Sequence, residues 1–182
     1  MSSAHTSLPL IVRKEEANGP LCQQFKEEMK TELSHLLGHR MQLPPEARPQ
    51  LLPGGSVCLV AELDSCHEPQ SQHSPKSVVG SLCLIPLQPG SGCAKNLPAQ
   101  ARVGEIKRVL TRPAYRRHGA QRVLLTANED LARMELSLHL LVLETLHALP
   151  EAQKMYESYG WKRRETFGFY DATYSVCYEK WL

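Results

Sequence analysis

Three successive segments in the second half of the chain restrict its fold more than any other feature. Val103–Leu110 is rich in branched apolar residues and predicts a strand, and a helix is expected from Gly119 to about Glu135. Leu138–Leu146 is then an almost continuous apolar run, which indicates a strand buried on both faces. A strand, a helix and a second strand in this order predict two parallel strands joined by a crossover.

The remaining segments add helices and strands in an order that is neither all-α nor all-β. Large apolar residues recur every four positions from Leu21 to Leu37, which predicts a helix that ends at Gly38. A last helix is expected to begin at Pro150 and to end at Gly160. Further strands are expected at Leu8–Val12, Val57–Leu63, Ser77–Leu87, from Trp161 onward and at Tyr174–Trp181, with loops at 39–55, 64–76 and 88–100. These elements predict an α+β fold in a single domain.

A basic turn lies between the first of the two parallel strands and the helix that follows it. Residues 102–122 contain seven arginines and lysines against one acidic residue, although the whole chain has a formal net charge of only +2. A helix start offers unpaired backbone N–H groups and the positive end of the helix dipole. With Arg116, Arg117, His118 and Arg122 around it, this start is expected to bind a pyrophosphate without a metal. The balanced total charge gives no indication of a nucleic-acid partner.

The cysteines and histidines form no recognisable metal-binding pattern. The six cysteines include no Cys-x-x-Cys pair, and several, Cys58 and Cys83 among them, lie in apolar runs where a free thiol behaves as a small buried hydrophobe. The spacing of Cys66, His67 and His73 matches no zinc pattern and lacks a fourth ligand. No metal is therefore expected.

The ends and the apolar runs of the chain bear on its location. The first seven residues are polar, so no secretory signal is visible, and no apolar stretch reaches the length of a membrane span. A reducing cytosol or nucleus is therefore expected, with unpaired thiols and without a membrane partner, and a cytoplasmic location is the first choice.

Two motifs resemble signatures of the GCN5-related N-acetyltransferase (GNAT) superfamily. The segment Arg-Arg-His-Gly-Ala-Gln at 116–121 resembles the acetyl-CoA motif Arg/Gln-x-x-Gly-x-Gly/Ala, although Gln121 stands where Gly or Ala is usual. Glu151–Trp161 looks like the family signature Ala-x-x-x-Tyr-Glu-x-x-Gly-Phe, about 30 residues further on. Segments 143–145 and 175–180 resemble a branch of small bacterial and fungal acetyltransferases.

The resemblance implies a fold and a cofactor. The expected sheet is mixed, with about six or seven strands and about four flanking helices, and its fourth and fifth strands splay apart around the pantetheine arm of acetyl-CoA. A backbone amide of Val109 or Leu110 would then polarise the thioester carbonyl. The residues expected to bind acetyl-CoA are Val109, Leu110, Thr111, Arg116, Arg117, His118, Gly119, Ala120, Gln121 and Arg122.

The same resemblance suggests the residues that move protons. Tyr156 is expected to protonate the departing thiolate of CoA, and Tyr159 is the weaker alternative. Glu105 is expected to accept the proton of the incoming ammonium group, directly or through water, and Glu144 is its rival. The alternative for Glu105 is a plain salt bridge to a neighbouring lysine or arginine.

The predicted activity is the transfer of an acetyl group from acetyl-CoA to a primary amine of a small molecule, in a ternary complex formed by one domain spanning residues 1–182. Two alternatives stay open, a CoA-binding regulatory domain with little catalysis and an enzyme that acetylates lysines or N-termini of proteins. Phe167, Phe169 and Tyr170 either line the acceptor pocket or cover the edge of the core. A homodimer that pairs through Tyr174–Trp181 is a further hypothesis.

Overall fold

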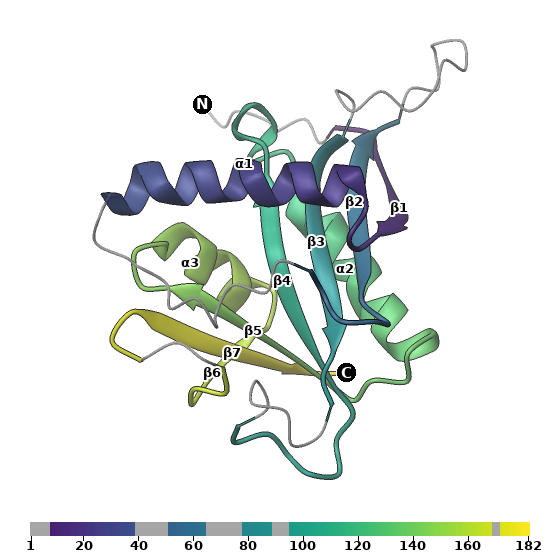
Figure 1. Ribbon diagram of the computed structural model, residues 1–182, viewed down its shortest axis with the longest axis vertical. Coiled ribbons are helices and arrows are strands. Elements are labelled where there is room, and N and C mark those ends of the chain that lie inside the picture. Colours follow the sequence, from purple (N-terminus) through teal and green to yellow (C-terminus); the bar gives the residue numbers. More distant parts are fainter. Residues whose placement is uncertain (1–7, 39–50, 65–77, 89–94, 169–171) are drawn as a thin grey trace, which may run out of the picture.

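A seven-stranded sheet runs through the whole protein (Figure 1). The computed structural model describes residues 8–38, 51–64, 78–88, 95–168 and 172–182. The strands lie in the order β1-β2-β3-β4-β5-β7-β6, and β4 and β5 are parallel whereas all other neighbours are antiparallel. The strands are β1 (Leu10–Glu16), β2 (Val57–Leu63), β3 (Val78–Pro86), β4 (Val103–Thr111), β5 (Leu140–Leu146), β6 (Lys162–Arg164) and β7 (Ser175–Trp181). The expected α+β fold with a mixed sheet is confirmed.

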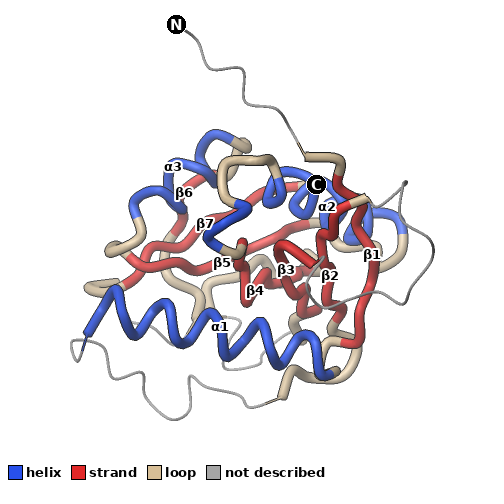
Figure 2. Tube along the Cα trace, turned by 90° about the horizontal axis from the view of Figure 1, so that it is seen from above, coloured by secondary structure: helices blue, strands red, loops and turns tan. Residues whose placement is uncertain are grey.

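Helices cover both faces of the sheet. Helix α1 (Pro20–Leu37) lies on one face, and α2 (Ala120–Met134) and α3 (Pro150–Ser158) lie on the other (Figure 2). A single turn of 3-10 helix, η3 (Pro113–Tyr115), connects β4 to the start of α2. The described residues thus contain three α-helices and this short turn, close to the expected four helices. None of the described helices has the length and apolar character needed to cross a membrane.

The edge strand β1 departs from its expected position. The sequence predicted a strand at the short apolar run Leu8–Val12, but β1 begins at Leu10 and continues through charged residues to Glu16. Every residue of β1 pairs with β2, and Arg13 Nε donates to Glu62 on β2 at 3.0 Å. Tertiary pairing therefore overrides the local preference of the charged residues, whose side chains can remain in part accessible at an edge.

Each face of the sheet has its own core. Leu124 of α2 and Tyr156 of α3 belong to the larger core, which also contains Ile106 of β4. Phe25 of α1 packs into a second core on the opposite face. A third, smaller cluster gathers around Phe167, which is fully buried.

Strand β4 changes its pairing halfway along. Its residues Val103–Ile106 pair with β5, and β5 then continues beside β7 alone. On its other side, Leu110 and Lys107 lie opposite Ser81 and Cys83 of β3, so β4 carries one extra residue there. The extra residue forms a bulge at Arg108, whose φ is +55°. The expected splaying of the fourth and fifth strands is confirmed, and it begins at this bulge.

Candidate active site

The open half of β4 leaves backbone groups without strand partners. Arg108 and Val109 have no register partner on β3, and no residue of β4 beyond Ile106 has one on β5. Such backbone N–H and C=O groups need partners other than the sheet. A ligand that enters between β4 and β5 would find hydrogen-bond donors and acceptors there, as an added strand does at a sheet edge.

The basic turn brings a second set of free donors to the end of β4. Arg117 and Gly119 both adopt a positive φ, at 68° and 87°, and these reversals turn the chain into α2. No side chain caps the start of α2, and no acidic residue lies in its first turn. The first backbone N–H groups of α2 are thus available to an anion, next to the positive end of the helix dipole.

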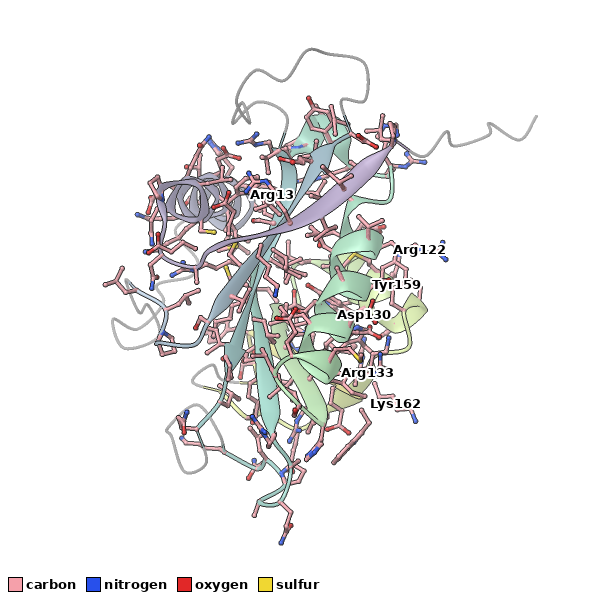
Figure 3. All side chains as sticks on the ribbon, turned by 90° about the vertical axis from the view of Figure 1, so that its right-hand side faces the viewer. Arg13, Arg122, Asp130, Arg133, Tyr159 and Lys162 are labelled. Carbon is pink, nitrogen blue, oxygen red and sulfur yellow. The ribbon has the colours of Figure 1, made fainter. Side chains whose placement is uncertain are left out.

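The arginines of this turn have different surroundings. Arg116 donates through Nε to the carbonyl oxygen of Thr111 at 3.1 Å and forms a salt bridge with Glu32 of α1. Arg112 binds Glu28 of α1 with two hydrogen bonds, of 3.0 and 2.8 Å. By contrast, Arg122 is exposed and projects outward from the first turn of α2 (Figure 3). Two arginines therefore tie α1 to the end of β4, whereas Arg122 is open to solvent.

A cavity of about 850 Å³ lies between α1 and the end of β4. Leu110, Pro113 and Arg116 form one wall, and side chains of α1 form the other. The residues from α1 are Gln24, Glu27, Glu28, Thr31, Glu32, His35 and Leu36. Two residues that the motifs predicted to contact acetyl-CoA, Leu110 and Arg116, thus face the same open space.

Gln121 occupies the motif position where Gly or Ala is usual, and its side chain turns toward β4. Its amide nitrogen donates to Thr111 Oγ1 at 2.8 Å, whereas its buried amide oxygen has no hydrogen-bond partner among the described residues. The contact joins the first turn of α2 to the last residue of β4. An amide group therefore stands between two segments that were both predicted to bind the cofactor.

Glu105 lies on β4 just before the bulge and is only 2% exposed. Its carboxylate accepts from Lys107 Nζ at 2.7 Å, so the salt bridge considered for it is present. Burial raises the pKa of Glu105, and the ammonium group of Lys107 opposes that rise. A carboxylate with a raised pKa is a stronger base than an exposed one.

Glu144, the rival base, lies on the neighbouring strand β5 and is more strongly engaged. Its Oε1 accepts from Ser175 Oγ at 2.5 Å and from the Cys177 thiol at 3.8 Å. Burial raises the pKa of Glu144, against the hydrogen bond from Ser175. Its other oxygen, Oε2, is buried and has no partner among the described residues. The structure thus brings both candidate carboxylates to the same face of the sheet.

Tyr156 points into the larger core from α3 and is 4% exposed. Its ring makes a T-shaped contact with Trp161 at 6.1 Å and a tilted contact with Tyr178 at 5.9 Å. Burial raises the pKa of its hydroxyl group, which therefore keeps its proton at neutral pH. The alternative, Tyr159, is half-buried, and its carbonyl oxygen accepts from Lys180 Nζ at 2.9 Å.

Of the three aromatic residues that were expected to line the acceptor pocket or to cover the edge of the core, the structure describes Phe167. Phe167 is fully buried in the small cluster with Val142 and Cys177, so it covers the core. Phe169 and Tyr170 lie outside the described residues. The metal pattern rejected at Cys66, His67 and His73 also lies outside them.

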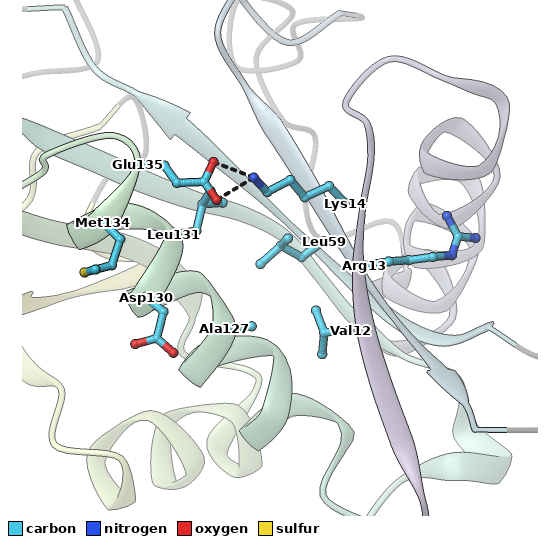
Figure 4. A pocket seen from close by; sticks show the side chains of 9 residues that line it. All are labelled: Val12, Arg13, Lys14, Leu59, Ala127, Asp130, Leu131, Met134 and Glu135. Carbon is cyan, nitrogen blue, oxygen red and sulfur yellow. Dashed lines mark hydrogen bonds and ion pairs between the residues drawn. The ribbon is translucent and has the colours of Figure 1, made fainter. Parts of the chain in front are cut away.

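A second hollow lies on the other face of the sheet, and neither motif contributes residues to its lining. It measures about 290 Å³ and separates β1 from α2, where Lys14 Nζ binds Glu135 Oε1 at 2.6 Å (Figure 4). None of the residues predicted to bind or to react lines it. The cavity beside Leu110 and Arg116 is therefore the stronger candidate for a ligand site.

Sequence motifs did not reveal the contribution of α1 to this cavity. Glu28 and Glu32 lie in a helix with an ordinary amphipathic pattern, and each is 84 residues from its arginine partner. The only available signal was that acidic residues occur on the polar face of α1 while the turn after β4 is basic. That signal does not identify pairs.

Comparison with known proteins agrees with the motifs and the fold. The family model described as acetyltransferase (GNAT) family matches residues 23–161. No curated protein sequence matches the chain.

Solved structures share the fold over almost the whole chain. A protein of Klebsiella pneumoniae assigned as an acyl-CoA N-acyltransferase is 23% identical, with a TM-score of 0.64, over 95% of this chain and 97% of the other. A GCN5-related N-acetyltransferase of Kribbella flavida is 21% identical, with a TM-score of 0.61, over 95% and 98%. A spermidine/spermine N-acetyltransferase of Vibrio cholerae is 17% identical, with a TM-score of 0.53, over 95% and 92%.

Proposed function

The chain belongs to the acetyltransferase (GNAT) family, and we propose that it transfers an acetyl group from acetyl-CoA to a primary amine of a small molecule. The observation that carries the proposal is the loss of β5 pairing beyond Ile106, directly before the uncapped start of α2. Donor groups for a pantetheine arm and for a pyrophosphate thus lie at the two ends of one short segment.

The pyrophosphate would bind at the basic turn. Backbone N–H groups from Arg117 to Arg122 would donate to it, and the side chains of Arg116 and Arg122 would add charge. Gly119 permits the positive φ of 87° that aims these N–H groups, and no atom lies within 4 Å of where its side chain would begin. The glycine is thus required for its backbone conformation and not for lack of space.

The pantetheine arm would lie along the open half of β4, from Val109 to Thr111. The backbone amide of Val109 or Leu110 would donate to the thioester carbonyl oxygen and stabilise the charge that develops on it. The bulge at Arg108 supports this role, because it removes Val109 from the register of β3. In a strand without the bulge, the same amide would donate a hydrogen bond to the neighbouring strand.

The acid and the base would act from opposite faces of the sheet. Glu105 alternates with Ile106 along β4, and Ile106 packs in the core of Tyr156, so Glu105 and Tyr156 approach the gap from different sides. Glu105 would take the proton of the ammonium group, directly or through water, and Tyr156 would give a proton to the leaving thiolate. Transfer would be direct, because the amine and the thioester meet in one ternary complex.

The cavity beside α1 supports a small acceptor. Its volume of about 850 Å³ lies within the range of small-molecule sites, and it opens next to Leu110, where the thioester would lie. We propose in addition that the enzyme is cytoplasmic and that acetyl transfer requires no nucleic acid, membrane or metal. The homodimer remains a hypothesis. It would pair through Tyr174–Trp181, but β6 already covers the central part of this segment at Cys177–Glu179.

The test is an acetylation screen with the full-length protein. Acetyl-CoA is incubated with panels of small amines, amino acids and peptides, and the release of free CoA thiol is followed together with the mass of each product. Turnover on a small amine supports the proposal, and turnover on peptides alone replaces it with a protein acetyltransferase. Tight binding of CoA without turnover on any amine class would leave a CoA-binding domain.

A further inference from the structure

Three cysteines that are distant in the sequence meet beneath α1. Cys22 comes from α1, Cys58 from β2 and Cys83 from β3, and their three sulfur atoms all lie within 4.8 Å of one another. The three residues are 2%, 0% and 1% exposed. None of the roles proposed for acetyl transfer involves them, although Cys83 lies opposite Lys107 of β4.

The fold itself sets this convergence. Cys58 and Cys83 are direct partners across β2 and β3, so their side chains emerge side by side on one face. Cys22 lies one helical turn before Phe25, the fully buried residue with which α1 packs on that face. Apolar side chains of the same core, such as Val60, surround the three thiols. The cluster is therefore dry and held in place by packing on all sides.

A positive charge acts on the same cluster. Hydrogen bonds from the Cys22 and Cys58 thiols lower the pKa of Cys83, and the charge of Arg108 lowers it further, whereas hydrogen bonds with the other two cysteines and burial raise the pKa of Cys58. The Nη1 atom of Arg108 is buried and has no hydrogen-bond partner among the described residues. A buried guanidinium nitrogen without an acceptor is costly, and an anionic sulfur cluster nearby would offset part of that cost.

We propose that Cys22, Cys58 and Cys83 form a three-thiolate site for a soft metal ion, Cu(I). Thiolate ligands select Cu(I), zinc or iron–sulfur clusters. Zinc in structural sites takes four ligands, and iron–sulfur clusters take four cysteines, whereas the described residues offer three sulfurs and no fourth His, Cys, Asp or Glu in the group. Cu(I) is the remaining ion of that set, and it accepts three sulfurs.

The separation of the sulfur atoms suits a trigonal ion. Metal–sulfur bonds of about 2.3 Å would place three sulfurs around one ion about 4.0 Å apart. The three thiols, all within 4.8 Å of one another, would need to contract by less than about 1 Å. Binding exchanges three thiol protons, which pass to solvent, for one Cu(I), and no group is oxidised or reduced. Because α1 also lines the cavity beside Leu110, the ion would fasten that wall to the sheet.

The experiment is an anaerobic titration of the full-length protein with Cu(I), in competition with the chromophoric chelator bicinchoninate. The parent protein carries Cys66→Ser and Cys93→Ser, which removes two cysteines outside the described residues. We expect one equivalent of Cu(I) to bind, with an affinity that rises with pH because protons are released. X-ray absorption at the copper edge should give three sulfur neighbours at about 2.3 Å.

Single substitutions separate this site from unspecific thiol binding. Cys22→Ser and Cys83→Ser should each weaken Cu(I) binding at least tenfold, whereas Cys177→Ser, which removes a buried cysteine of another cluster, should leave it unchanged. Circular dichroism checks the fold of each variant. Equal binding by the Cys83→Ser variant, fewer than three sulfur neighbours in the parent protein, or a Cys58–Cys83 disulfide in place of bound copper would each overturn the proposal. The absorption measurement needs no variant and decides the question even where a substitution prevents folding.

Discussion

The two halves of strand β4 have opposite environments although they are continuous in the chain. Val103–Ile106 lies between β3 and β5, and all four residues are buried. In Lys107–Thr111 the β5 partner is gone, a bulge interrupts the pairing with β3, and three of the five residues are partly exposed. The first half fixes the position of the strand, and the second half leaves its backbone free for a ligand.

The boundary between these halves is where charge gathers. Glu105 lies near the end of the closed half with a buried carboxylate, and Lys107 begins the open half and binds it at 2.7 Å. A buried carboxylate is tolerated there because its partner lies on the same strand, two residues away. A half-strand that is paired on both sides can thus hold a reactive group beside the gap that the other half opens.

The largest expected effect comes from disturbing the closed half. A side chain at Gly104 would begin 2.6 Å from Leu138 Cδ1 and 2.8 Å from Leu84 Cδ1, so Gly104→Val should lower the free energy of unfolding by about 3 kcal/mol. Denaturation by urea measures it. Gly54→Val is the matched control, because nothing lies within 4 Å of that position, and its effect should stay within about 0.5 kcal/mol. Equal losses for both variants would refute the tight packing of the closed half.

The next effect concerns the carboxylate at the boundary. Glu105→Gln should lower kcat by about 100-fold at neutral pH, because the amide cannot accept the proton of the ammonium group. Since burial raises the pKa of Glu105, the acid limb of the pH–rate profile should lie above the ordinary range of a glutamate, and it should vanish in the variant.

The stability of the protein should respond to the same group with a defined sign. The folded state binds the Glu105 proton more tightly than the unfolded chain, because the pKa is raised. Protonated Glu105 therefore contributes stability that is fully present below its pKa in the unfolded chain and is lost as the pH rises through its pKa in the folded protein.

Glu144→Gln is the matched control for the kinetic effect of Glu105→Gln. Loss of the acid limb in that variant and not in Glu105→Gln would assign the base to Glu144.

A smaller effect is expected at the tyrosine. Tyr156→Phe should lower kcat by about 30-fold with little change in the KM for acetyl-CoA, since only the proton for the thiolate is removed. Steady-state kinetics across the pH range measures both constants. Tyr159→Phe, at the residue that follows the same helix, should retain kcat. An unchanged kcat for Tyr156→Phe would remove that residue from the role of acid.

The local sequence was sufficient to predict the helix and strands around the gap, but not their contacts with more distant segments. The strand, the turn and the helix from Val103 to Met134 follow from apolar patterns, a glycine and the charge of one short segment. The splay was expected from a family resemblance and not from propensity. The positive φ of Arg108 has no local cause, because arginine does not favour it, so it arises from the register that β3 imposes.

Contacts between distant segments could not be predicted from the sequence. The pairs of Glu28 with Arg112 and of Glu32 with Arg116 depend on how α1 crosses the sheet, which the amphipathic pattern of α1 does not specify. The meeting of Cys22 with two strand cysteines has the same origin. Periodicity indicates which face of an element is buried, but it leaves open which residue of another element it meets.

The smallest effect tests the junction between the open half of β4 and α2. Gln121→Ala restores the residue type that is usual in the acetyl-CoA motif, and it removes the 2.8 Å hydrogen bond to Thr111 together with a buried amide oxygen that has no partner among the described residues. Losing the bond should cost about 1 kcal/mol, and removing the unpaired oxygen should return a similar amount, so stability should change by less than about 0.5 kcal/mol. The KM for acetyl-CoA should change by less than about threefold, because backbone N–H groups do most of the binding at a helix start. Thr111→Val is the matched variant. It leaves the amide nitrogen of Gln121, like its amide oxygen, without a hydrogen-bond partner among the described residues. Thr111→Val should therefore be the more destabilising of the two by urea denaturation. The reversed order would show that the Gln121 side chain has other partners in solution.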